Sequence, residues 1–301
     1  MILRPVVQGA GGNSFYKRIS TEPFLNSDAH FPAPTMSHHH GHRSLHSRLH
    51  LHTQFASNLI DEKHDFIVYV PQAFHHDPNR FFPVLYLHDG QNLFDPETSF
   101  IKGNYWRVGE AADGMIAAGE VEPMVIVGIY NAGAKRINEY TPLEDRRLGG
   151  GNADAYGQML VEELKPFVAH QYRTLAGPEN CGMGGSSLGG LVTLYLGMRY
   201  PDVYGKLAVF SPSVWWRDRV ILKYVERIPQ KTGQRIWLDI GTSEGRRAMP
   251  DVRALKRMLV KKGWRPGKDL EYREIQGGQH TEYAWAERVA PMLKFLFPRR
   301  G

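Results

Sequence analysis

Residues 180–190, which read Asn-Cys-Gly-Met-Gly-Gly-Ser-Ser-Leu-Gly-Gly, decide the fold of this chain. An extended segment at 180–184 leads here into an apolar helix that we expect from residue 187 to about 200. Residues 185–189 fit the pattern G-x-S-x-G, with Ser187 in the nucleophile position. The surrounding glycines lack a Cβ atom, so a strand, a sharp turn and a helix can approach closely. The stretch therefore predicts a turn that lifts the Ser187 hydroxyl above the end of a sheet, where the N-terminus of the following helix favours a developing negative charge.

The same pattern occurs a second time, in Gly-Thr-Ser-Glu-Gly at residues 241–245, so the pattern alone does not select the nucleophile. Charged residues follow Ser243, and the next helix is expected only from about residue 250. One strand remains before the last histidine, which is too little chain to supply both an acid and a base. Ser187 is therefore the predicted nucleophile.

Strand-like and helix-like segments alternate from residue 48 onward. Continuous apolar runs such as residues 124–130 are typical of strands that are covered on both faces. Repeated strand-helix units predict an open, mostly parallel sheet with helices on both faces and its active site at the carboxyl ends of the strands. The first two strands should form an antiparallel pair at the N-terminal edge. The expected strands are residues 48–57, 65–70, 82–88, 124–130, 180–184, 206–210, 235–240 and 270–275, and the expected helices are residues 106–120, 154–172, 187–200, 219–227, 250–262 and 281–297.

The composition, with 42% hydrophobic and 23% charged residues, is that of an ordinary globular protein. The net charge of +6 is weak support for nucleic-acid binding, because the basic residues do not cluster with interleaved aromatic residues. The apolar runs fall short of the roughly 20 residues that span a bilayer, and the N-terminal sequence has no apolar signal segment. The single cysteine, Cys181, excludes an internal disulfide bond. We expect a soluble, cytoplasmic protein without a nucleic-acid or membrane partner; the oligomeric state stays open.

Residues 1–47 lack sustained periodicity and are rich in Gly, Pro, Ser and His. They predict a loosely ordered leader in front of a catalytic domain at residues 48–301. Eight of the fourteen histidines lie between His30 and His52, and imidazole is a common metal ligand. Acidic and Cys partners at the spacing of a metal site are missing beside this tract, so we expect no physiological metal site. Met36 is an alternative start of translation.

A serine hydroxyl barely ionises near neutral pH, so the nucleophile needs a base. His280 follows the last expected strand in a glycine-containing turn that could aim its imidazole back over the sheet. The acid that orients this imidazole should follow the strand at residues 235–240, in the order serine, acid, histidine. Glu244 lies just beyond that strand and is favoured. Asp239, within the strand, and Asp251, at a helix start, stay open as alternatives.

An oxyanion needs two backbone N–H donors. One should come from Leu188, directly after the nucleophile. The other should come from Gln91, in the turn after the strand at residues 82–88, where Gly90 lets the backbone pass under the substrate carbonyl. This chemistry requires neither a metal nor an organic cofactor.

Several motifs in the same order resemble the putative esterase (esterase D-like) family of α/β-hydrolases, and most closely its enterochelin-esterase-like predicted hydrolases. The family includes enterochelin esterases, feruloyl and acetyl-xylan esterase domains, S-formylglutathione hydrolases and mycolyltransferases. The resemblance covers residues 48–297. Its marks are Val84-Leu85-Tyr86-Leu87-His88-Asp89-Gly90-Gln91-Asn92, Arg136 with Glu139-Tyr140-Thr141-Pro142, Gly185-Ser186-Ser187-Leu188-Gly189-Gly190, Ser211-Pro212-Ser213 followed by Trp215-Trp216, and Gly278-Gln279-His280 with Trp285.

The resemblance implies an α/β-hydrolase fold and a serine carboxylic-ester hydrolase that acts on a small-molecule ester. Ser187 matches the family's nucleophile, His280 its base, and Gln91 and Leu188 its oxyanion donors, while Glu244 stands where relatives often carry aspartate. Residues Arg136, Tyr140, Trp215 and Trp216 would then line the acyl or alcohol pocket. Siderophore lactones, sugar acetates, feruloyl sugars and small thioesters stay open as substrates. An acyltransferase with the same triad, or a non-catalytic binding protein of this fold, is the alternative.

Overall fold

A computed structural model describes residue 45 and residues 48–299 of the chain. The predicted leader at residues 1–47, with its histidine tract and Met36, therefore lies outside the described residues except for Leu45. Within the described part, the helices are too short or too polar to cross a membrane.

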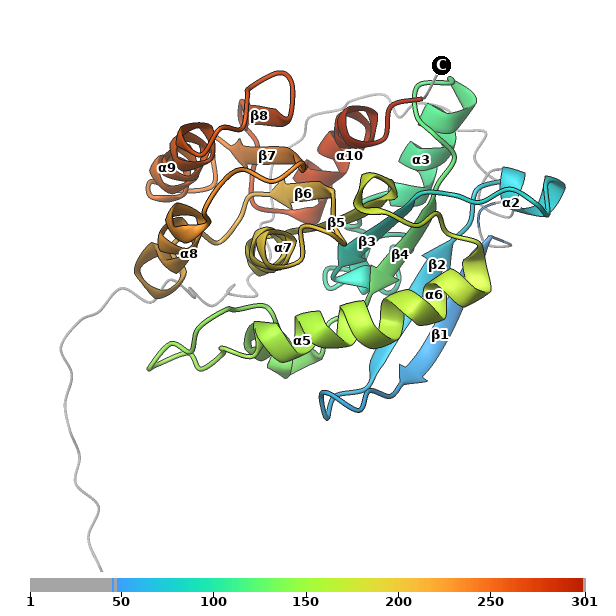
Figure 1. Cartoon of the computed structure of the whole chain (residues 1–301), viewed down its shortest axis with the longest axis horizontal. Coiled ribbons are helices and arrows are strands. Elements are labelled where there is room, and N and C mark those ends of the chain that lie inside the picture. The colour runs from blue at the N-terminus through green and yellow to red at the C-terminus, as the bar shows by residue number, and fades with distance from the viewer. Residues whose placement is uncertain (1–44, 46–47, 300–301) are drawn as a thin grey trace, which may run out of the picture. The chain divides into compact units, whose positions relative to one another are not determined.

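Eight strands form one sheet in the order β1-β2-β4-β3-β5-β6-β7-β8 (Figure 1). The first two strands and the β2–β4 pair are antiparallel, and the remaining neighbours are parallel. The predicted mostly parallel sheet with an antiparallel N-terminal edge is confirmed. The strands are β1 Leu49–Phe55, β2 His64–Tyr69, β3 Val84–His88, β4 Val125–Ile129, β5 Cys181–Ser186, β6 Lys206–Phe210, β7 Arg235–Gly241 and β8 Leu270–Ile275.

Helices connect the strands. The α-helices are α2 Ala73–His76, α3 Val108–Ala117, α4 Arg136–Glu139, α5 Ala153–Met159, α6 Lys165–Tyr172, α7 Leu188–Arg199, α8 Trp216–Arg227, α9 Ala248–Lys261 and α10 Glu282–Leu296. Three short 3₁₀ segments, η1 Gly90–Asn92, η2 Gly133–Lys135 and η4 Pro178–Asn180, and one π-helical segment, η3 Leu160–Leu164, complete the elements.

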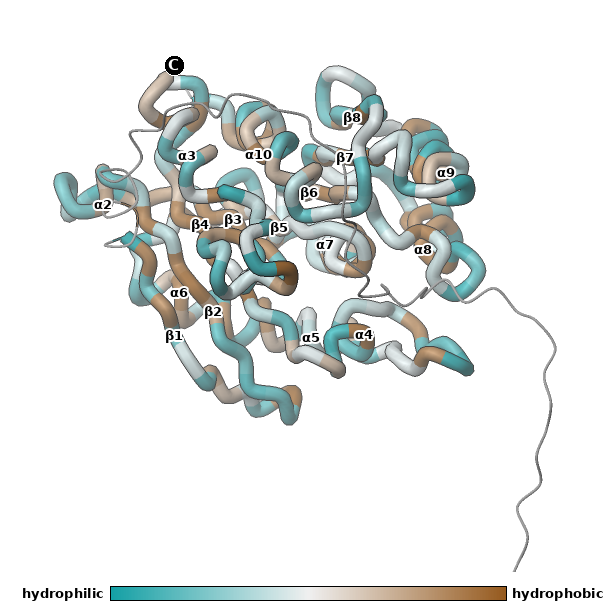
Figure 2. Tube along the Cα trace, turned by 180° about the vertical axis from the view of Figure 1, so that it is seen from behind, coloured by the Kyte–Doolittle hydropathy of each residue, from teal (hydrophilic) through white to brown (hydrophobic). Residues whose placement is uncertain are grey.

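Each face of the sheet carries its own hydrophobic core. Helices α5 to α9 pack on one face, where Val84, Val127 and Leu207 point toward residues such as Leu191 of α7. Helices α3 and α10 cover the other face, which is lined by alternate strand residues such as Leu85. This alternation follows from the two-residue period of a strand. Hydrophobic residues run along β2, β3 and β4 in the middle of the sheet (Figure 2).

Two predicted helices differ in detail from the structure. The helix expected at 154–172 consists of α5, the π-helical turn η3 and α6 in direct succession. The helix expected at 219–227 begins in α8 at Trp216, but the three residues 217–219 have positive φ angles and break the helical path. The regular part of α8 therefore follows this kink, close to the predicted start.

Candidate active site

Ser187 lies at the turn between β5 and α7, with φ 59° and ψ −120°. A non-glycine residue with this backbone conformation is strained, and such strain is typical of functional sites. Glycines make the turn possible: a Cβ atom on Gly185 would lie 3.0 Å from the backbone of Gly189, and one on Gly190 would lie 2.8 Å from the Phe210 carbonyl oxygen. The local geometry is that of the predicted nucleophile turn.

His280 and Glu244 lie together at the same sheet edge. The His280 Nδ1 atom is 2.8 Å from Glu244 Oε2. The glutamate side chain is 1% exposed and the imidazole 44% exposed, so the carboxylate is buried behind a ring that faces solvent. The loop after β7, which carries Glu244, and the loop after β8, which carries His280, are joined by a hydrogen bond of 2.9 Å from the Ser243 N–H to the Gly278 carbonyl. The second G-x-S-x-G copy thus supports the histidine turn.

The two alternatives to Glu244 are engaged elsewhere. The buried Asp239 carboxylate accepts hydrogen bonds from Arg288 at 2.7 Å and from Trp237 at 2.7 Å. Asp251 forms an ion pair with an arginine of α8. Among these three acids, Glu244 is the one that the structure brings to His280.

The other carboxylate oxygen of Glu244 accepts three hydrogen bonds from neighbouring protein groups. Its Oε1 atom accepts hydrogen bonds from the Gly241 N–H at 2.7 Å, the Ser211 hydroxyl at 2.7 Å and Arg288 Nη2 at 3.4 Å. Burial acts to raise the pKa of Glu244, but the hydrogen bonds from His280 and Ser211 outweigh it and hold the pKa below its ordinary value. An ionised carboxylate accepts only, so Nδ1 of His280 carries the proton and Nε2 is left as a base.

The hydroxyl of Ser187 lies 3.2 Å from the Ser213 hydroxyl. Among the hydrogen bonds of the described residues this is the one made by Ser187 Oγ, so its bond to His280 is not formed in this structure. Hydrogen bonds of catalytic groups often tighten only once substrate is bound. Ser213 also binds the nucleophile turn through its backbone, because its N–H donates to the Ser187 carbonyl at 2.9 Å.

The predicted oxyanion donors follow two neighbouring parallel strands, β3 and β5. Leu188 is the first residue of α7, where a helix leaves its N–H groups unpaired, and Gln91 lies in η1. Within the described part of the chain, neither N–H donates to a backbone acceptor. Gly90 is required by close packing, since a Cβ atom there would lie 2.4 Å from the backbone of Gly128. Both N–H groups are therefore available to a ligand.

Arg136 clamps the loop that carries Gln91. Its Nε and Nη2 atoms donate to the two oxygens of Asp89 at 2.6 and 2.7 Å, and Asn131 Nδ2 adds a third bond at 2.7 Å. Asp89 itself has a left-handed backbone with φ 58°. Burial acts to raise the pKa of Asp89, but Arg136 outweighs it and the pKa lies below its ordinary value. Arg136 thus holds the strained turn in front of Gln91, the predicted oxyanion donor, a role that its sequence context did not signal.

The other predicted pocket residues divide into buried and exposed ones. Tyr140 and Trp216 are completely buried. The Tyr140 hydroxyl accepts the Asp89 N–H at 3.2 Å, and Trp216 Nε1 donates to the Leu143 carbonyl at 2.8 Å. Trp215 is 49% exposed. Of this aromatic set, Trp215 therefore offers most surface to a substrate, whereas Tyr140 and Trp216 shape the loops from within.

A buried ion pair lies beside Tyr140. His64 Nε2 is 3.0 Å from Glu139 Oε1, and His64 Nδ1 is 3.0 Å from the Tyr130 carbonyl. Both ring nitrogens therefore face oxygen acceptors, an arrangement that suits an imidazolium. Burial acts to lower the pKa of His64, but Glu139 outweighs it and the pKa is raised. Glu139 thus pairs with His64, whereas the neighbouring Arg136 pairs with Asp89.

This ion pair predicts a pH-dependent stability. A raised histidine pKa adds stability that is fully present below about pH 6.5 and is lost as the pH rises through the folded-state pKa. We expect His64→Gln to reduce the free energy of unfolding more at pH 6 than at pH 9, by about 1.4 kcal/mol for each unit by which the pKa is raised. Urea unfolding of both proteins at the two pH values measures this difference. The exposed control His76→Gln should keep the wild-type free energy of unfolding at both pH values. If His64→Gln lowers the free energy of unfolding equally at pH 6 and pH 9, His64 is not an imidazolium in the folded protein.

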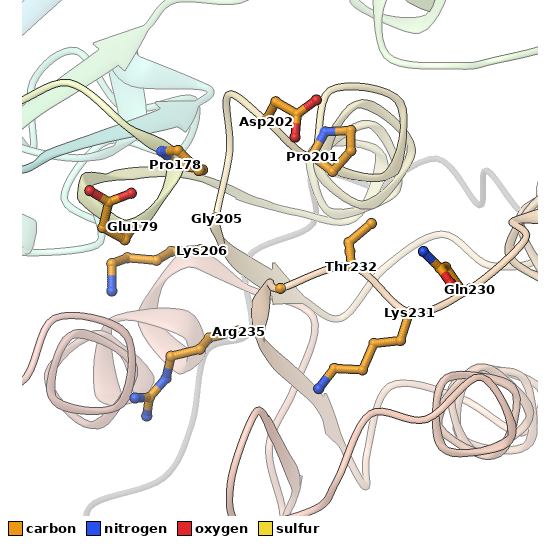
Figure 3. A pocket seen from close by; sticks show the side chains of 11 residues that line it. Pro178, Glu179, Pro201, Asp202, Gly205, Lys206, Gln230, Lys231, Thr232 and Arg235 are labelled. Atoms are coloured by element: carbon orange, nitrogen blue, oxygen red, sulfur yellow. The ribbon is translucent and has the colours of Figure 1, made fainter.

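A separate cleft of about 500 Å³ lies at the amino ends of β6 and β7 (Figure 3). Its lining includes Lys206, Arg235 and the loop at residues 230–233. Ser187, Glu244 and His280 follow the carboxyl ends of their strands, at the opposite edge of the sheet. The cleft is therefore no part of the candidate active site.

Residues 57–296 match the family described as Putative esterase. The chain belongs to this family. It is a carboxylic ester hydrolase with the α/β-hydrolase fold, so the predicted family, fold and enzyme class are confirmed.

Relatives of the esterase include uncharacterized and named proteins. It is 26% identical over 203 residues to the uncharacterized protein YbbA of Bacillus subtilis, which covers 65% of this chain and 74% of YbbA. It is 25% identical over 188 residues to the ferri-bacillibactin esterase BesA of the same organism, covering 57% of this chain and 62% of BesA. The solved siderophore hydrolase EstA of Aspergillus nidulans is 18% identical, with a TM-score of 0.66 over 89% of this chain and 98% of EstA. This last likeness concerns the fold alone.

Proposed function

We propose that the esterase cleaves a small-molecule carboxylic ester through an acyl-enzyme on Ser187, with His280 as base and Glu244 as the acid that orients it. The observation that carries this proposal is the Glu244–His280 hydrogen bond of 2.8 Å at the sheet edge where the strained Ser187 turn ends. It leaves Nε2 of His280 as the acceptor of the serine proton.

The reaction has two halves. Nε2 takes the proton of Ser187 as Oγ attacks the ester carbonyl, and the oxyanion accepts hydrogen bonds from the N–H groups of Gln91 and Leu188. The imidazolium then donates its proton to the leaving alkoxide. Water, deprotonated by the same nitrogen, attacks the acyl group and releases the acid and Ser187.

Intact-protein mass spectrometry tests the covalent step. Incubation with a slowly hydrolysed aryl ester or a fluorophosphonate should add one acyl or phosphonyl mass, and peptide mapping should assign it to Ser187. An adduct on another residue, or hydrolysis without any trapped adduct, would argue against the mechanism. An acyltransferase forms the same adduct, so graded sugar or alcohol acceptors are added to turnover; an unchanged product ratio rejects that alternative.

The rim of this sheet edge favours a particular kind of ester. Nine large hydrophobic residues are exposed in the described part of the chain, and five of them lie in segments that follow the carboxyl ends of strands: Phe100, Ile101, Leu143, Leu148 and Trp215. A sixth, Tyr283, is the second residue of α10, which follows β8. Exposed arginines lie at the same edge of the sheet: Arg146 and Arg147 in the loop after α4, Arg217 at the start of α8, and Arg246 and Arg247 in the loop after β7. Aromatic and cationic side chains together suit an aromatic, anionic ligand. A ferric siderophore ester, the kind of substrate in the name of the relative BesA, is therefore the substrate class we propose.

Removing rim charge should weaken binding of anionic esters selectively. We expect Arg146→Ala/Arg147→Ala to raise KM for an anionic aryl ester about three- to tenfold and to leave KM for a neutral aryl ester unchanged. The difference should shrink at high salt, since both arginines are exposed. Steady-state kinetics at low and high ionic strength measure it, with Arg257→Ala on α9 as control. An equal rise in KM for the anionic and the neutral ester would show that the two arginines do not recognise the substrate's charge.

A further inference from the structure

A buried charge network behind Glu244 is not used by the reaction just described. The Arg288 side chain, from the middle of α10, is 2% exposed and the Asp239 side chain is 0% exposed. Arg288 Nη1 donates to Asp239 Oδ1 at 2.7 Å, and its Nη2 atom lies 3.4 Å from Glu244 Oε1. One guanidinium thus connects two buried carboxylates, and His280 lies at the exposed end of the chain of contacts.

Stability does not explain this arrangement well. Ions are costly to bury, and a buried ion pair is often no more stabilising than apolar side chains of similar volume. Two carboxylates beside a histidine would favour the protonated imidazole, which cannot accept a proton from Ser187. A single positive charge between them offsets that effect.

We infer that Arg288 is a positioning residue: its positive charge offsets the effect of the two buried carboxylates on His280, and its hydrogen bond helps to fix Glu244. The inference rests on the proposed function, because it assigns Arg288 a role only if His280 is the base.

The Ser211 hydroxyl determines which oxygen of Glu244 faces His280. Its hydroxyl oxygen accepts hydrogen bonds from Trp285 Nε1 at 3.0 Å and from Arg288 Nη1 at 3.1 Å. Its single hydrogen therefore points to Glu244 Oε1, at 2.7 Å. With Oε1 occupied in this way, Oε2 is the oxygen presented to His280. The Trp285 ring also packs edge-on against the imidazole, with centroids 4.8 Å apart.

Arg288 supports the histidine turn as well. A Cβ atom on Gly278 would lie 2.8 Å from Arg288 Nη2. The guanidinium thus packs directly under the backbone two residues before His280, and the same group that neutralises the carboxylates holds the turn in place.

Other charged groups lie at the start of α10, on the loop after β3 and on α4. Glu282, at the start of α10, interacts electrostatically with His280, Asp89 and Arg136. Burial raises the pKa of Asp239 to about 6, against the effects of Arg288 and Trp237, so Asp239 is mainly ionised at neutral pH. The carboxylates of Glu282 and of the loop at residues 89–91 are the same in all variants of Arg288 and Asp239. Differences between the pH profiles of these variants therefore report on the Arg288–Asp239 pair.

The pH dependence of kcat/KM tests the inference. Arg288→Met should move the acidic limb of the profile about one pH unit upward, because it removes a positive charge, and Asp239→Asn should move it downward. The double variant, which removes both charges, should return the limb close to that of the wild type. Arg288→Lys keeps the charge without the planar fork, so it should lower kcat with little movement of the limb. The exposed control Arg253→Met should change neither.

A packing defect would not move the acidic limb in opposite directions in Arg288→Met and Asp239→Asn. If the variants lose kcat while their acidic limbs coincide with that of the wild type, Arg288 is structural only and the inference is overturned. If Arg288→Met fails to fold, Asp239→Asn and the double variant still test the inference. The acidic limb should then move downward in Asp239→Asn and return to the wild-type position in the double variant, a pattern that is equally specific. A wild-type protein that hydrolyses no ester would overturn the proposed function and this inference together, whereas unshifted limbs in active variants would overturn this inference alone.

Discussion

Ser187→Ala is expected to lower kcat/KM for ester hydrolysis by about 10⁴- to 10⁶-fold. The substitution removes the Oγ atom that carries the acyl group in the proposed mechanism, while the surroundings of the turn change little. Residual activity above water would come from the oxyanion donors alone. Progress curves with a panel of acetyl, feruloyl and lactone esters measure the loss, and thermal unfolding of both proteins shows that the variant is folded.

The second G-x-S-x-G copy supplies a matched control. Ser243 supports the histidine turn through its backbone N–H, which alanine retains. We therefore expect Ser243→Ala to keep kcat/KM within about twofold of the wild type. Equal hydrolysis by wild type and Ser187→Ala would sink the mechanism, and loss of activity in Ser243→Ala but not in Ser187→Ala would point to the other serine.

Much of the fold could be predicted because its signals are local. Apolar runs such as residues 124–130 identify buried strands, and the glycines around Ser187 identify the strand-to-helix turn. The π-helical turn η3 and the kink at residues 217–219 carry no such signal. They depend on how the helices pack, which overrides intrinsic preference.

The chemistry-bearing residues of the site could be ordered from sequence, but their partners could not. The order of Ser187, Glu244 and His280 along the chain placed them at one sheet edge. The roles of Arg136 and Arg288 were missed, because each acts on an acid from a different element and linear order does not show which charges meet. A buried arginine in the apolar pattern of α10 was the one available signal: position 288 faces the core, where a charge needs a partner.

Burial decides the roles of the aromatic residues. Tyr140 and Trp216 were predicted to line the substrate pocket, yet both are enclosed and hydrogen-bonded to loop backbone. Linear order does not distinguish Trp215 from Trp216. The loop at their position turns one ring toward solvent and the other inward, so only the folded chain distinguishes the exposed ring from the buried one.

His280→Gln is the second substitution with a large expected effect, about 10⁴-fold or more in kcat at neutral pH. Glutamine can still donate an amide hydrogen to Glu244 Oε2, so the loop keeps a hydrogen bond, but its side chain cannot take the proton of Ser187. The remaining activity should rise steadily with hydroxide concentration, because solvent base replaces the imidazole. The wild-type rate should instead rise once, through the imidazole range, and then level off.

Labelling by a fluorophosphonate separates the base from the rest of the site. Its rate should fall in parallel with kcat in His280→Gln, since both reactions need an activated Ser187. The exposed control His170→Gln on α6 should keep both rates. If His280→Gln retains kcat within about tenfold, with an acidic limb like that of the wild type, then another group takes the serine proton. The Glu244–His280 hydrogen bond would in that case be a structural tie between the loops after β7 and β8.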